Sequence, residues 1–274
     1  MIRVASLEWK RQCKSKLWIW CILPSIVLSL YIGSQDLTAY AFDIQKAINA
    51  WDMVTFMANN ALVISAAVAI PFLLWVGDAI STDFGTGYGI CVMSRLRGKN
   101  PALTYVAGKI VAVTALAGVT AFANVGTWLL MGALLFKFGG SWSQFMVSHS
   151  PYLPSGEVAT RVSPWIATVS AAGLIMLILT VLALTGFAVS ALVRSVYAGH
   201  AAGLLAVGMS LWLGTNNGTY AWSITAQAIW LLHSPFAAEA VEALPFTWSL
   251  SYLFGILVLA ATVLSVGLQR RQDW

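Results

Sequence analysis

The residues that could support acid-base or nucleophilic chemistry are few in this chain and lie far apart. Its three histidines, His149, His200 and His233, belong to separate segments. Neither a Ser/His/Asp arrangement, nor paired carboxylates, nor the Cys/His spacing of a zinc site can be proposed from the sequence. A phosphate-binding loop of the form Gly-x-x-x-x-Gly-Lys-Ser/Thr is also missing. We therefore expect a chain that is not an enzyme, that binds no metal or cofactor, and that does not hydrolyse ATP itself.

The composition is that of a membrane protein. Hydrophobic residues make up 59% of the 274 positions and charged residues only 9%, whereas an ordinary soluble domain has roughly 25% charged residues. The net charge of +5 does not come from a basic cluster on a soluble module, so nucleic-acid binding is disfavoured. We predict a single all-helical transmembrane domain that occupies residues 1–274.

Six stretches are apolar enough to be placed in a bilayer, whose hydrocarbon core requires about 20 residues of helix. The predicted spans are 17–33, 60–76, 110–136, 164–193, 196–213 and 247–268. The first could also be a secretory signal peptide, because it follows a basic segment. The residues after it lack an Ala-x-Ala cleavage pattern, which favours a span.

The distribution of Lys and Arg predicts the orientation. Twelve of the fifteen fall on the side of the amino terminus, and only Lys46, Lys137 and Arg161 fall on the other. Short cytoplasmic loops retain cations. We therefore predict a multi-pass protein of the plasma membrane with both termini in the cytoplasm.

Two segments outside the spans have a distinctive pattern. Residues 1–16, placed on a helix, put Ile2, Ala5, Trp9 and Cys13 on one face and cations on another. This predicts an interfacial helix on the membrane surface, although a plain basic flank explains the charge equally well. The second segment, 78–109, reads as an acid, a small-residue turn, an apolar patch and a basic cluster. We interpret it as a short docking element at the cytoplasmic surface.

That second segment resembles the loop between the second and third spans of type-2 ABC exporter permeases. In that family an acid and an aromatic precede a Gly-Thr or Thr-Gly-Thr turn, a basic cluster follows, and Gly-Lys or Ala-Lys opens the third span. The residues that match this order are Asp83, Phe84, Thr86, Gly87, Arg95, Arg97, Gly108 and Lys109. Two departures concern the contact register: the usual proline after Ser94 and Arg95 is absent, and the stretch from Gly87 to Lys109 is longer than usual.

The resemblance implies a function and partners. The chain would be the permease of an ATP-driven exporter, and a separate ABC ATPase, in two copies, would hold ATP and magnesium. A second permease copy or homologue would complete the path. The residues expected to couple to the ATPase are Asp83, Phe84, Thr86, Gly87, Arg95 and Arg97. The few charges in the spans favour a hydrophobic or amphipathic substrate, such as a drug, an antibiotic peptide or a lipid-like molecule.

Residues 214–246 are neither a full span nor a polar loop. They contain two short apolar pieces separated by His233, Ser234 and Pro235. We predict a re-entrant hairpin on the outer face, as the resemblance also implies, because irregular backbone at membrane depth must be covered by protein or water. A seventh and an eighth span are the alternative.

A few polar and small residues within the spans are candidates for the transport path or for helix packing. Asn60, Asn124 and His200 could line a path, but interhelical hydrogen bonds or interfacial positions explain them as well. Gly199 and Gly203 form a Gly-x-x-x-Gly pair that predicts close helix approach or a dimer seam. The rival to a transporter is a membrane-embedded enzyme or sensor without an ATPase. It would need a cluster of polar residues at one depth, which the sequence does not indicate.

Overall fold

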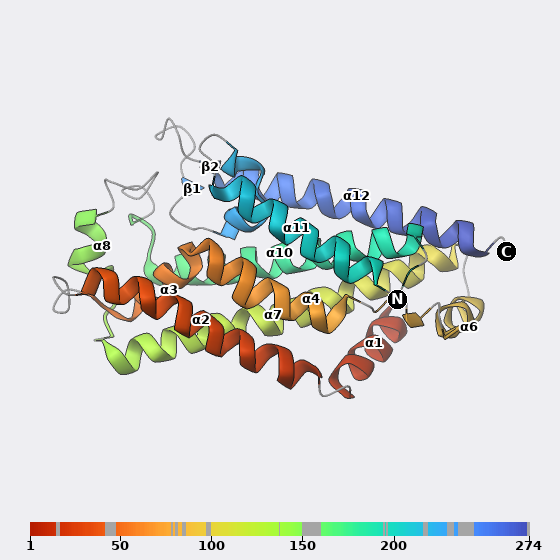
Figure 1. The fold of residues 1–274 in the computed structure, drawn as a ribbon, viewed down its shortest axis with the longest axis horizontal. Helices are drawn as coiled ribbons and strands as arrows, with labels where there is room; N and C mark the ends of the chain where they lie inside the picture. The colour runs from red at the N-terminus through yellow and green to blue at the C-terminus, as the bar shows by residue number, and fades with distance from the viewer. Residues whose placement is uncertain are drawn as a thin grey trace.

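The protein is a bundle of long helices, seen in a computed structural model (Figure 1). The structure describes residues 1–14, 17–41, 48–77, 79, 82–83, 86–96, 100–136, 138–149, 160–193, 195, 197–215, 219–228, 233–234 and 244–272. Both chain ends lie at one end of the bundle, together with the short helices α1 (Ile2–Lys14) and α6 (Tyr88–Arg95) (Figure 1). We call this the α1/α6 end.

Each stretch that the sequence predicts as a span contains helix. The long helices are α2 (Leu17–Ala41), α7 (Pro101–Leu135), α10 (Pro164–Val193), α11 (Ala198–Thr215) and α12 (Phe246–Gln272). Among the described residues, α7, α10 and α12 are long and apolar enough to cross a membrane. A fourth joins them if a bent pair of helices counts as one span. The fold is therefore compatible with an all-α membrane protein.

Helix α10 forms the centre of the bundle. Its apolar residues face all directions, and it packs against α7, α11 and α12. A helix that is hydrophobic all round is stable only when it is surrounded by protein or lipid. Helix α12 is much more exposed than α10, so it lies at the periphery.

The bent pair covers Ala50–Asn59 and Val63–Val76, so its bend lies at the start of the predicted span 60–76. Helix α3 (Ala50–Asn59) turns by 87° into a π-helix, η1 (Val63–Ala69), which continues as α4 (Ile70–Val76). The Asn60 side chain accepts hydrogen bonds from the backbone N–H groups of Leu62 and Val63, at 2.9 and 3.1 Å, so it caps the new helix. Pro71 lacks an N–H group and clashes with the carbonyl one turn earlier, which favours the wider π-helix before it.

Helix α7 begins at Pro101 rather than near Ile110, so the end of the predicted docking loop is helical. Asn100 caps it by accepting a hydrogen bond from the Leu103 N–H at 3.0 Å, and Pro101 has the φ angle suited to a first turn. The sequence predicts Lys109 as the last residue of the docking segment 78–109. In the structure it lies inside the helix and is only 1% exposed.

The segment between α11 and α12 is irregular in its described part. It contains two 3₁₀ turns, Tyr220–Trp222 and Thr225–Ala228, and a two-residue parallel pair of strands, β1 (His233–Ser234) and β2 (Leu244–Pro245). The second 3₁₀ turn is buried, and the Gln227 amide donates to the carbonyls of Ala221 and Ser223 at 3.0 and 2.9 Å. The second predicted half-helix, near residues 236–244, lies almost wholly outside the described residues.

Three helices meet through glycine backbone rather than through side chains. A Cβ atom at Gly186 of α10 would lie 2.6 Å from the Gly199 carbonyl oxygen of α11, and one at Gly199 would overlap the Gly77 carbonyl oxygen after α4. Gly203 differs, because a Cβ atom there would lie 3.2 Å from the Leu73 side chain of α4. The Gly199/Gly203 pair therefore serves close approach within the chain. Both glycines are buried within the chain, and a dimer seam at these positions stays a prediction.

We expect Gly199→Ala to lower the free energy of unfolding by about 1–3 kcal/mol, the usual cost of overpacking. The new methyl group would collide with backbone, which cannot rotate away. Gly208→Ala on the same helix is the matched control, because a Cβ atom there meets nothing within 4 Å and alanine is the better helix former. Thermal unfolding in detergent measures both. Equal melting temperatures for the two variants would contradict the backbone contact.

Candidate functional site

One face of α1 is packed against the beginning of α7. Val4, Glu8 and Gln12 are spaced four residues apart and are all buried, as expected of one helix face. Gly108 of α7 allows the close contact, since a Cβ atom there would lie 2.6 Å from the Val4 Cβ atom. The predicted apolar face with Ile2 and Trp9 points away from the bundle, with Ile2 79% exposed. The N-terminal helix is thus amphipathic, but its most buried face includes a carboxylate.

That carboxylate belongs to a group of four charged residues, which we call the ion cluster: Glu8, Arg11, Asp83 and Lys109. Lys109 of α7 forms ion pairs with Glu8 and, at 2.6 Å, with Asp83. Arg11 pairs with Glu8 at 2.8 Å and also with Asp83. Each cation therefore contacts both carboxylates, and the formal charges of the cluster sum to zero.

Polar neighbours complete the cluster. The Tyr105 hydroxyl donates to Asp83, and the Gln12 amide donates to Glu8 at 2.9 Å. The Ala79 carbonyl accepts from both Arg11 and Lys109, each at 3.3 Å. A buried charge is tolerated only when it is paired and its remaining hydrogen-bonding capacity is used. These contacts meet that requirement.

Three of the four members of the ion cluster are buried. Asp83, Lys109 and Glu8 are 0%, 1% and 3% exposed, and the Arg11 side chain is about one third exposed. Burial acts to lower the pKa of Arg11, but the charges of Glu8 and Asp83 outweigh it, so the pKa of Arg11 is raised. Arg11 consequently stays a cation, and the cluster stays neutral.

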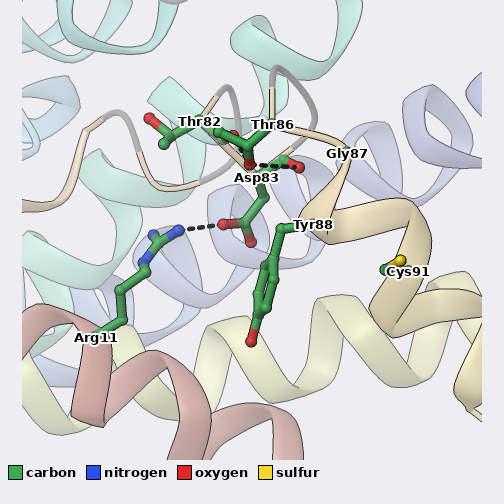
Figure 2. A pocket seen from close by; sticks show the side chains of 7 residues that line it. All are labelled: Arg11, Thr82, Asp83, Thr86, Gly87, Tyr88 and Cys91. Carbon is green, nitrogen blue, oxygen red and sulfur yellow. Dashed lines mark hydrogen bonds and ion pairs between the residues drawn. The ribbon is translucent and has the colours of Figure 1, made fainter.

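An open cavity of about 500 Å³ lies beside Asp83, between α1 and α6 (Figure 2). Its lining residues are Arg11, Thr82, Asp83, Thr86, Gly87, Tyr88 and Cys91. Gly87 has φ +72°, a left-handed conformation that suits glycine, and it turns the chain into α6. Figure 2 shows the Tyr88 ring reaching from the start of α6 past the Asp83 carboxylate. Burial, and then the charge of Asp83, raise the pKa of Tyr88, so its phenol remains neutral.

The residues predicted to couple to an ATPase have different environments in the structure. Asp83 is buried in the ion cluster, whereas Thr86 and Arg95 are exposed. The Thr86 hydroxyl donates to the Thr82 carbonyl at 2.8 Å. Phe84 and Arg97 lie outside the described residues. A partner protein would therefore meet Thr86, Tyr88 and α6, and would reach Asp83 only through them.

The predicted path residues are all in packed positions. Asn124 is fully buried in α7, where its side-chain oxygen accepts from Ser25 and Ser29 of α2 at 3.1 and 3.4 Å. Its amide group donates to the Thr120 carbonyl at 2.9 Å. The half-buried His200 lies against Gly77, and Asn60 caps the bend. Asn124 thus joins α7 to α2, whereas the hydrogen bonds of Asn60 to Leu62 and Val63 lie within its own helix.

Sequence reasoning did not identify Glu8, Arg11 or Tyr105 as site residues. A signal for Glu8 was present: it is the only acid before Asp36, in a segment that also holds five cations. A single acid among five cations indicates that its carboxylate has a specific partner in the fold. Its partner, Lys109, is far away in the chain and could not be identified from spacing.

The described residues contain no group of three or more His, Cys, Asp or Glu side chains that could hold a metal ion. The two carboxylates of the ion cluster are each paired with both cations. What the arrangement can do is mechanical. It fastens α1, the Asp83 segment and α7 to one another.

Comparisons with known proteins identify no relative: no family model, no curated protein and no solved structure matches this chain.

We expect Lys109→Met or Glu8→Gln alone to destabilise the protein by about 3–5 kcal/mol, because each leaves an uncompensated buried charge. The double variant restores neutrality, since Arg11 and Asp83 remain as one pair. It should therefore lose much less stability than the sum of the two single variants. Thermal unfolding in detergent gives the comparison.

Lys10→Gln is the control for this cycle, because Lys10 is exposed on the same helix and surface changes usually stay within about 0.5 kcal/mol. Strictly additive losses in the double variant would show that Glu8 and Lys109 do not interact.

Proposed function

We propose that this chain is the membrane-spanning permease subunit of an ATP-driven exporter, with a separate ABC ATPase as its partner. The observation that carries the proposal is the ion cluster. It connects the exposed docking element, which is the Asp83 segment with α6, to the first turns of the long apolar helix α7. A membrane-bound machine driven from outside the bilayer needs such a connection.

The mechanical argument follows from the position of Lys109. Helix α7 has 35 residues, which at 1.5 Å per residue is about 52 Å, longer than a bilayer's hydrocarbon core. A force applied at α6 or the Asp83 segment passes through Asp83 and Lys109 to the end of this helix. A rigid helix moves its far end when one end is displaced. ATP-driven closure of two ATPase subunits would supply that force.

The proposed topology has six spans with both termini in the cytoplasm. Support comes from the position of α1, α6 and both chain ends at the same end of the bundle (Figure 1). Among the described residues, this end carries the Lys and Arg residues of α1 and α6. In this arrangement the irregular segment between α11 and α12 is a re-entrant hairpin on the outer face. Its buried polar groups are hydrogen-bonded, as membrane depth requires.

The proposed substrate is hydrophobic or amphipathic. Between Lys109 and the end of α7, and throughout α10 and α11, the described chain contains no Asp, Glu, Lys or Arg. A hydrophilic or ionic substrate would need compensating charges along its path. One permease cannot enclose a path by itself, so the working exporter has two permeases and two ATPases. ATP and magnesium are bound by the ATPases.

The test is co-purification with an ABC ATPase, which is sought first among the reading frames that neighbour this chain's own. The variant is Arg95→Glu together with Ile90→Asp, both on exposed positions of α6. Neither residue belongs to the ion cluster, so folding should be kept while the docking surface changes sign. We expect the variant to lose the ATPase by about tenfold or more, as when several contacts of an interface are removed.

Arg161→Glu is the matched control, because Arg161 is exposed and belongs to the opposite side in the proposed topology. It should keep the ATPase. If the well-folded natural protein binds no ATPase at all, the proposed function is wrong.

A further inference from the structure

Helix α1 has an exposed surface that the ion cluster and the proposed function do not use. Its buried face carries Val4, Glu8 and Gln12. At 100° per residue, the remaining circumference divides into an apolar side, with Ile2 and Trp9, and a cationic side. The cationic side consists of Arg3, Lys10 and Lys14, all exposed.

The exposed surface of α1 is purely cationic in its charged groups. The one acid of the helix, Glu8, is 3% exposed and is paired with Lys109 and Arg11. Docking of α1 thus removes its negative charge from the surface and leaves three positive charges. Such a surface is complementary to an anionic partner.

The orientation and the apolar residues favour a membrane as that partner. Helix α1 crosses the end of the bundle at a steep angle to the long helices (Figure 1), which places it in the plane of a bilayer that those helices cross. Ile2 is 79% exposed and Trp9 37% exposed. The exposed Trp18 of α2 follows soon after in the chain. Indoles and aliphatic side chains flanked by cations are typical of helices that lie at the headgroup level.

We propose that α1 is a binding site for anionic phospholipids, whose headgroups pair with Arg3, Lys10 and Lys14 while Ile2 and Trp9 enter the bilayer boundary. This rests on the proposed function only in that the chain is embedded in a membrane. Its consequence bears on the ion cluster, because Glu8 and Arg11 belong to the same rigid helix. Lipid charge that holds α1 also holds the partners of Lys109 and Asp83.

The native thiol of Cys13 provides the reporter, since it is exposed on α1. With Cys21→Ala and Cys91→Ser, a bimane label on Cys13 is the single fluorophore of its kind. The labelled full chain is reconstituted in phosphatidylcholine vesicles that contain spin-labelled phosphatidylglycerol or, in a parallel sample, spin-labelled phosphatidylcholine. The ratio of the two quenching efficiencies measures the enrichment of the anionic lipid around α1.

We expect phosphatidylglycerol to quench more strongly than phosphatidylcholine, and salt to reduce the difference. Each cation near an anionic surface contributes up to roughly fivefold to binding. Arg3→Gln, Lys10→Gln and Lys14→Gln together should therefore abolish the preference without changing the melting temperature. Arg161→Gln removes one charge on the opposite side of the membrane in the proposed topology and should leave the preference intact.

Equal quenching by the two lipids at low salt would overturn the proposal. Equal quenching together with loss of the ATPase from the triple variant would also overturn it, because the three cations would then bind the ATPase rather than lipid. A lipid preference without any bound ATPase would support the lipid site while the proposed exporter function fails. The two proposals can thus be separated.

Discussion

The structure depends on one electrostatic constraint: the carboxylates of Glu8 and Asp83 and the ammonium of Lys109 are nearly or fully removed from water. An isolated ion in such a place costs several kcal/mol, so each must keep an opposite charge in contact. Because those charges come from α1, the Asp83 segment and α7, none of these segments can separate without exposing or stranding an ion. The constraint turns three segments, distant in sequence, into one unit.

This constraint also gives the short sequence around Gly108 and Lys109 a physical meaning. Gly108 leaves room for Val4, and Lys109 reaches Glu8 and Asp83. The small residue and the cation act together, since the ion pair can form only when the two helices come close. The geometry offers a reason for that pairing in this chain.

The sequence was informative about helices and much less so about their contacts. Apolar length alone located the six stretches, and the limits of α10 agree with the predicted 164–193. The predicted span 60–76 begins at the 87° bend, but helix α3 before the bend and the early start of α7 at Pro101 were not predicted. Both depend on side-chain caps, and the effect of a single capping residue is not visible in the apolar length of a segment. The Glu8–Lys109 pair could not be predicted, because a contact between residues so far apart exists only once the helices have packed. The exporter function itself stays a proposal.

The glycine contacts among α4, α10 and α11 have a consequence for motion. Packed helices usually slide past one another by small changes of side-chain rotamers. At Gly77, Gly186 and Gly199 the touching atoms are backbone, and backbone has no rotamers to exchange. These three helices should therefore move together as a single rigid body. Any large rearrangement of the bundle must then occur outside the contacts among these three helices, for example where α7 and α12 pack against α10.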